Sequence, residues 1–216
     1  MPGRLTSRLL WFVFGVTILA LAYQFEDRLE MMFTGRGELK VEEEPGRVVL
    51  RWRGGIEAPM YARLDEAFRT LGPNTPRFVL SLHSPGGSLQ HGRDVIRLIK
   101  RVQATHAVDT VIEARRSCAS MCVPIYLAGN RRSADPKARF MFHEVSFRDS
   151  HSDKVERVPK DAIGRATDQF FERYLKPAGV DERWLAELRD AVRGKDVWRT
   201  AEQLIEQRAG VVQLLE

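Results

Sequence analysis

The sequence predicts an α/β fold in which a mainly parallel sheet is built from βαβ crossovers. Short apolar, β-branched runs alternate with segments in which apolar residues recur at helical spacing. Because parallel strands are normally joined through a helix, this alternation favours a parallel sheet covered on both faces. Hydrophobic residues make up 44% of the 216 residues and charged residues 29%, which is typical of a folded protein and not of a disordered one.

The elements are expected in a regular order. The strands are predicted at residues 48–52, 78–82, 110–114 and 140–142. The helices are predicted at residues 60–71, 89–102, 123–128 and 163–175. A last helix is expected after Asp181, whose side chain can cap it. The polar residues 145–160 show no periodicity and are expected to form an exposed loop or a weakly paired hairpin.

The beginning of the chain has the pattern of a targeting segment. Residues 9–23 (LLWFVFGVTILALAY) are almost entirely apolar and follow Arg4 and Arg8. A helix over them rises about 22 Å, less than the roughly 30 Å hydrocarbon core of a bilayer. Two interpretations stay open: a short single-pass membrane anchor, or a secretory signal cleaved near the Ala20-Leu21-Ala22 triplet. A buried helix of a soluble core is the third and weakest alternative.

Three parts of the chain are therefore expected. Residues 1–25 form the signal anchor or signal peptide, residues 26–44 a polar juxtamembrane stalk, and residues 45–216 the catalytic domain. Either targeting interpretation places that domain outside the cytoplasm, as a periplasmic domain of a membrane-anchored protein or as a secreted protein.

Charge and cysteine content exclude several classes of protein. The net charge is +5, but the arginines are scattered among acidic residues, and no nucleic-acid-binding motif accompanies them. We therefore expect no nucleic-acid partner. The only cysteines, Cys118 and Cys122, are too few for a closed zinc site, so no metal is expected, and no organic cofactor has a signature. The two cysteines either form a disulfide or pack as two small apolar residues.

Reactive residues follow three of the predicted strands. They are the SPGG segment at residues 84–87, the turn at residues 117–121, and His143. The carboxyl ends of parallel strands meet at one edge of a sheet, which is where ligands bind. There, a serine at a strand-to-helix turn exposes its hydroxyl, a histidine can act as its base, and glycine amides can bind an oxyanion. Each feature alone is common in ordinary turns, and the remaining histidines are expected to be structural or solvated: His83, His91, His106 and His151.

Taken in order, these motifs resemble the Clp protease proteolytic subunit and its crotonase-like relatives. The resemblance spans residues 48–206 and lies in the segments SLHSPGGSL, CASMCVPIYLAGNRR and RFMFHE. It implies a ClpP/crotonase-like sheet, here with an N-terminal hydrophobic helix added. It also implies a homo-oligomer, although residues 145–160 differ from the segment through which the family assembles its rings.

The resemblance assigns roles residue by residue. Ser120 is the nucleophile and His143 the base, and the amides of Gly87 and Met121 form the oxyanion hole. Gly86 and Ser88 lie along the substrate. The family's acid occurs in a segment similar to DVWRTA at residues 196–201, which makes Asp196 the expected acid and Asp190 the alternative.

The expected function is that of a serine endopeptidase that hydrolyses peptide bonds through an acyl-enzyme. Outside the cytoplasm no ATP-driven unfoldase can assist it, so short or unfolded chains are the expected substrates. Two alternatives remain. One is a crotonase-type enzyme acting on acyl-thioesters, which would need no serine–histidine pair. The other is an inactive binding or scaffold domain that keeps the fold.

Overall fold

The computed structural model describes residues 37–147 and 158–216, and these belong to one compact unit that begins at Arg36. The apolar segment at residues 9–23, the first part of the expected stalk and His151 lie outside the described residues. Among the residues that are described, no helix combines the length and apolarity needed to cross a bilayer.

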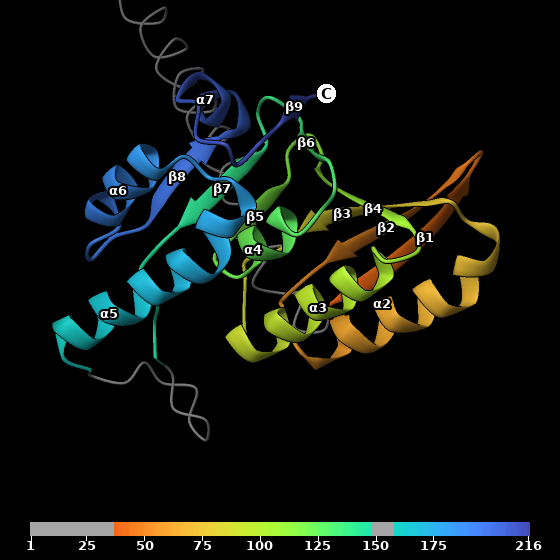
Figure 1. Cartoon of the computed structure of the whole chain (residues 1–216), viewed down its shortest axis with the longest axis horizontal. Helices are drawn as coiled ribbons and strands as arrows, with labels where there is room; N and C mark the ends of the chain where they lie inside the picture. The colour runs from red at the N-terminus through yellow and green to blue at the C-terminus, as the bar shows by residue number, and fades with distance from the viewer. Residues whose placement is uncertain (1–36, 148–157) are drawn as a thin grey trace, which may run out of the picture. The chain divides into compact units, whose positions relative to one another are not determined.

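The larger sheet has the strand order β1-β2-β3-β4-β6-β9 (Figure 1). These strands are β1 (Glu38–Glu44), β2 (Arg47–Arg53), β3 (Arg77–His83), β4 (Ala107–Ile112), β6 (Arg132–Ala134) and β9 (Leu214–Leu215). Only the β1–β2 hairpin is antiparallel, and every other pair in this sheet is parallel. The mainly parallel α/β sheet predicted from the sequence is therefore confirmed.

A smaller sheet of three strands carries the reactive residues. It has the order β5-β7-β8, with β5 (Ser117–Ala119) parallel to β7 (Arg139–Phe142) and β7 antiparallel to β8 (Val197–Thr200). A bridge between Ser84 and Cys118 connects the end of β3 to β5. The SPGG segment therefore lies next to the turn that follows β5.

Helices cover both sheets. They are α2 (Ala58–Leu71), α3 (Leu89–Val102), α4 (Cys122–Leu127), α5 (Lys160–Phe170), α6 (Glu182–Ala191) and α7 (Ala201–Glu206). A 3₁₀ turn at Gly72–Asn74 follows α2, while α5 continues into a π-helical turn at Phe171–Leu175 and a 3₁₀ turn at Lys176–Ala178. Figure 1 shows α2 and α3 side by side across the larger sheet.

The short helix α4 is buried along its whole length and packs against α3, β4, β5 and β7. The hydroxyl of Tyr126 donates a hydrogen bond to the Ser133 carbonyl, at 3.1 Å, which ties α4 to β6. Burial raises the pKa of Tyr126 far above its usual range, so the phenol keeps its proton and remains a donor. A helix fixed in this way gives the turn before it a rigid support.

Several elements differ from the sequence-based expectation: β5, β6, β8, β9 and α7 were not predicted, and two further elements lie elsewhere than expected. Residues Glu38–Glu44, expected to belong to a solvated stalk, form β1 and pair along their whole length with β2, so the folded unit begins before residue 45. The strand expected at residues 110–114 lies at Ala107–Ile112, because residues 107–111 pair in register with β3 and the Arg77–Asp109 ion pair supports that register.

Candidate active site

Ser120 lies in a tight turn between β5 and α4. Its φ of 54° is in the left-handed region, where a residue other than glycine loses roughly 1–2 kcal/mol. Three backbone hydrogen bonds hold the turn: Ala119 N to Ser84 O, Ser120 N to Met141 O, and Val123 N to Ser120 O, at 2.9, 2.9 and 3.0 Å. This is the geometry of a nucleophile elbow, in which a strained turn exposes the hydroxyl at the end of a strand.

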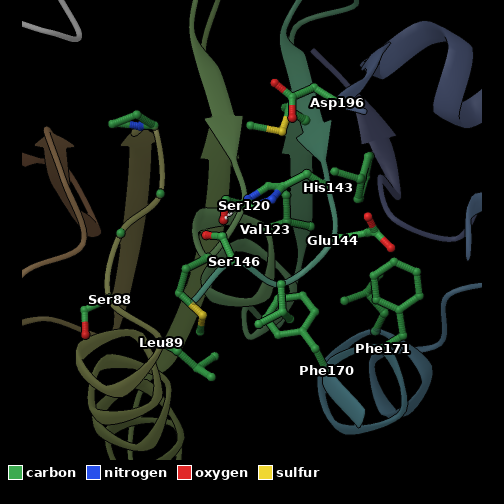
Figure 2. A pocket seen from close by; sticks show the side chains of 18 of the residues that line it. Ser88, Leu89, Ser120, Val123, His143, Glu144, Ser146, Phe170, Phe171 and Asp196 are labelled. Carbon is green, nitrogen blue, oxygen red and sulfur yellow. Dashed lines mark hydrogen bonds between the residues drawn. The ribbon is translucent and has the colours of Figure 1, made fainter. Parts of the chain in front are cut away.

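His143 follows β7, the strand beside β5. Its Nε2 lies 2.7 Å from Ser120 Oγ, and Figure 2 shows the two side chains facing each other. Both residues are half-buried. When the neutral ring carries its proton on Nδ1, the hydroxyl donates this hydrogen bond to Nε2, which is the arrangement needed to remove the serine proton during attack.

The SPGG segment packs directly against the nucleophile turn. Gly86 has φ 95°, and a Cβ placed on it would lie 2.7 Å from Ser120 Cβ and 2.8 Å from Ala119 O. Gly87 has φ 150° and bridges Ile56, and a Cβ there would lie 2.6 Å from the Ile56 carbonyl oxygen. Only glycine fits both positions, because each combines a positive φ with a backbone neighbour at that distance.

The two expected oxyanion donors have no acceptor among residues 37–147 and 158–216. Among the described residues, neither the Gly87 amide nor the Met121 amide donates a hydrogen bond to another group. The Gly86 amide, in contrast, donates to Ser84 Oγ at 3.1 Å. Free backbone donors beside a nucleophile are what oxyanion stabilisation requires.

Met121 and Ser88 are held by α3. Gly92 gives space to the Met121 side chain, since a Cβ at position 92 would lie 2.3 Å from Met121 Cγ. Ser88, expected along the substrate, lines the cleft, but its hydroxyl also caps α3 by accepting the His91 amide at 3.3 Å. The hydroxyl of Ser88 therefore has a structural role that the sequence motif did not reveal.

Cys118 and Cys122 form a disulfide on either side of Ser120. Their Cα atoms are 5.2 Å apart, and both residues are completely buried. From the sequence, either a disulfide or the packing of two small apolar residues was expected. The structure contains the disulfide.

The expected acid, Asp196, lines the cleft without contacting the base. It precedes β8, where the antiparallel register sets Phe142 opposite Val197, so His143 and Asp196 occupy the next pair of positions. Yet no carboxylate within the described residues hydrogen-bonds His143, and the Asp196 side chain is exposed. In the view of Figure 2, His143 lies between Ser120 and Asp196.

The alternative acid, Asp190, lies away from this arrangement. It is exposed on α6, pairs with Arg193 at 3.0 Å, and does not line the cleft. Glu144, which the sequence analysis did not select, lines the cleft and accepts the Gly194 amide at 2.8 Å. This bond joins the residue after His143 to the segment just before Asp196.

The groups meet in a cleft of about 960 Å³. Its floor opposite Ser120 is apolar, and Figure 2 shows the rings of Phe170 and Phe171 there. Sequence periodicity placed these two residues on the apolar face of a helix, but it could not tell a cleft wall from a core. Glu57 lines the same cleft and lies 3.4 Å from His91 Nδ1.

Other histidines have structural contacts. His83 is buried and accepts the Ser117 amide on Nδ1 at 3.1 Å, while His106 contacts the Gly72 carbonyl at 3.1 Å. Across residues 37–147 and 158–216, no group of three or more metal-ligating side chains gathers in one place.

We expect Gly86→Ala to lower turnover at this candidate site by about 10²-fold, the size of effect seen when one oxyanion donor is lost. The added methyl group would press on Ser120 Cβ and displace the nucleophile or the neighbouring amide. Gly46→Ala is the matched control, because Gly46 also has a positive φ, 79°, but nothing within 4 Å of its Cβ position. Equal turnover in the two variants, measured at matched stability, would contradict the close packing described above.

Comparisons with known proteins agree with this fold. No family model matches the sequence, and no curated protein matches it significantly. Among solved structures, a mutant of ClpP1 from Listeria monocytogenes is similar over 78% of this chain and 90% of its own, with TM-score 0.59 and 19% identity. A mutant of the membrane-bound stomatin-specific protease 1510-N is similar over 78% of both chains, with TM-score 0.60 and 16% identity. The chain therefore has the ClpP-like fold that its ordered motifs predicted.

Proposed function

We propose that this chain is a serine endopeptidase. The observation that carries the proposal is the 2.7 Å contact between Ser120 Oγ and His143 Nε2, beside two backbone amides that have no acceptor in the described part of the chain. A crotonase-type enzyme would use the amides but would not need this hydroxyl–imidazole pair. A scaffold domain would need neither the amide donors nor the hydroxyl–imidazole pair, and it would not need a serine in the left-handed conformation.

The mechanism follows from the geometry. Ser120 Oγ attacks the peptide carbonyl carbon while His143 Nε2 takes the hydroxyl proton. The Gly87 and Met121 amides donate to the oxygen that becomes negative in the tetrahedral intermediate. The imidazolium then gives its proton to the leaving amine. In the second half, His143 Nε2 takes a proton from the water that attacks the acyl carbon, and it returns this proton to Ser120 Oγ as the carboxylic acid leaves.

Asp196 is our proposed orienting acid. Its position beside His143 in the strand register supports this role, and a side-chain rotation would be needed to bring the carboxylate to Nδ1. Catalytic hydrogen bonds are often incomplete without substrate and tighten when it binds. Substrate in the cleft would exclude water and favour that rotation.

We expect Asp196→Asn to lower kcat at least tenfold, since an orienting carboxylate also stabilises the imidazolium. Asp190→Asn is the control and should stay within about twofold, because its ion pair with Arg193 is exposed and such pairs contribute little. Steady-state kinetics on one fluorogenic peptide measure both. A larger loss with Asp190→Asn would reassign the acid.

We further propose that the domain acts outside the cytoplasm on short or unfolded chains, anchored by or released from its N-terminal apolar segment. Support comes from the apolar run at residues 9–23 and from the disulfide, which persists in oxidising compartments. A topology reporter fused after Glu216 tests the location. A cytoplasmic reporter signal would contradict it.

The resemblance to the Clp family also leads us to propose a homo-oligomer. Multi-angle light scattering of the purified protein measures its mass directly. A monomer at micromolar concentration would contradict this part of the proposal.

The activity itself is tested with an unfolded protein substrate and no nucleotide. The purified chain should produce new peptide termini that mass spectrometry detects, and the same preparation of Ser120→Ala should produce none. An intact substrate after prolonged incubation with folded wild-type protein would contradict the proposal. Hydrolysis of an acyl-thioester without peptide cleavage would favour the crotonase-type alternative.

A further inference from the structure

The Cys118–Cys122 disulfide closes a short loop around Ser120. Cys118 and Cys122 are four residues apart, so their bond closes a loop that contains only Ala119, Ser120 and Met121. Ser120 is the central residue of that loop, and Met121 supplies one of the two proposed oxyanion amides. Any change in this loop would move both the attacking oxygen and a donor at once.

Both ends of the loop are attached to buried structure. Cys118 pairs with Phe140 in β7 and bridges Ser84 at the end of β3, and Cys122 is the first residue of α4. Both cysteines have no exposed surface. The disulfide therefore joins the strand that precedes the nucleophile to the helix that follows it.

Besides the disulfide, the loop is held by backbone hydrogen bonds, among them Ala119 N to Ser84 O, and by the packing of the Met121 side chain at Gly92. Ser120 is anchored through its amide to Met141 and through its carbonyl to Val123, and its side chain contacts His143. These hydrogen bonds hold Ser120 at φ 54°, a backbone conformation that serine disfavours. A covalent tether between the loop ends reduces the alternative conformations that this turn can adopt.

We propose that Cys118 and Cys122 are positioning residues of the site: their disulfide holds Ser120 in its left-handed conformation, so catalysis depends on the oxidised pair. This inference rests on the proposed peptidase function. It adds that the chain is catalytically competent only where disulfides persist, which couples activity to compartment. Both cysteines are buried, so a reductant can reach the bond only when the structure opens locally. The disulfide therefore restrains the loop and does not respond rapidly to redox changes.

The test compares the same protein in two redox states. Dithiothreitol supplies two electrons and two protons, the S–S bond breaks into two thiols, and dithiothreitol closes to its cyclic disulfide. To verify complete reduction, a portion of the reduced protein is denatured and alkylated. Its mass should then increase by two alkyl groups, one for each thiol. We expect fluorophosphonate labelling and kcat to fall about tenfold or more, with KM within about twofold, and both to recover on reoxidation.

The Cys118→Ala/Cys122→Ala variant is the second arm. It keeps two small residues at buried positions, should match the low kcat of the reduced protein, and should not respond to dithiothreitol. A loop this short constrains the unfolded chain less than a long one, so melting temperatures should change little and separate positioning from loss of fold. Leu188→Ala, at a buried residue of α6 outside the loop, is the control for lowered stability and should keep its labelling rate.

The outcomes separate the two proposals. If oxidised wild-type protein is labelled but full reduction leaves kcat unchanged, the disulfide does not position Ser120, while the peptidase stands. A tenfold rise in KM with no change in kcat would also overturn the proposed positioning role of the disulfide. If oxidised, folded protein is neither labelled nor active, both proposals are overturned.

Discussion

Ser120→Ala should abolish fluorophosphonate labelling and lower peptide turnover by about 10⁴-fold or more, as removal of a serine nucleophile does in unrelated enzymes. The account predicts this because no covalent intermediate can form without the Ser120 hydroxyl, while the cleft and its amides remain. Gel-based labelling and fluorogenic turnover measure the two effects separately. Substrate binding should be retained, so KM should change far less than kcat.

The fold should tolerate this change. The Ser120 side chain makes its hydrogen bond to His143, and its methylene group remains in alanine. Ser146→Ala is a matched control, since this serine lines the same cleft but has no place in the mechanism. Labelling of Ser120→Ala at the wild-type rate would show that another residue is the nucleophile.

His143→Ala should lower kcat by about 10³-fold or more, because the proton of Ser120 then has no acceptor and general-base catalysis contributes about 10²–10⁴-fold. The hydroxyl alone is a weak nucleophile, so labelling should slow in parallel. The second-order rate constant of labelling and kcat are measured on the same preparation of the variant and compared with the wild-type values.

The controls for His143→Ala come from two other histidines. His106→Ala removes a ring that contacts the Gly72 carbonyl far from the cleft, and it should leave labelling unchanged at matched stability. His91 borders the cleft beside Glu57, so His91→Ala tests whether any histidine near the site is sufficient. A loss with His91→Ala as large as with His143→Ala would contradict the assigned base.

The fold explains why residues far apart in sequence meet. The SPGG segment follows β3, Ser120 follows β5, and His143 follows β7, so three strand ends deliver the amides, the nucleophile and the base to one edge. Asp196 reaches the same edge by a different route, because β8 runs antiparallel to β7 and its first residues face the end of β7. The smaller sheet is therefore the element that assembles the site.

Much of the fold and two residues of the site were predictable from local sequence patterns. Strands β2, β3 and β7 are apolar enough to be read directly, and the long helices have regular apolar faces. Asp181 caps α6 as expected, by accepting the Trp184 amide at 2.8 Å. Ser120 and His143 could be placed because each follows a strand within a specific motif.

Other features depend on tertiary contacts that sequence periodicity does not contain. No residue of the edge strand β1 is buried and four of its seven residues are glutamate, so its pattern is that of a solvated segment until β2 pairs with it. Strands β6 and β9 have three and two residues, too few to show alternation. The disulfide depends on side-chain directions that a spacing of four does not fix.

The most direct test is a crystal structure of the fluorophosphonate adduct. We expect phosphorus bonded to Ser120 Oγ, with the phosphoryl oxygen 2.7–3.1 Å from the amide nitrogens of Gly87 and Met121, the range for oxyanion donors, and with His143 Nε2 beside the leaving position. An adduct on a different residue would contradict the account. So would an oxygen directed away from both amides.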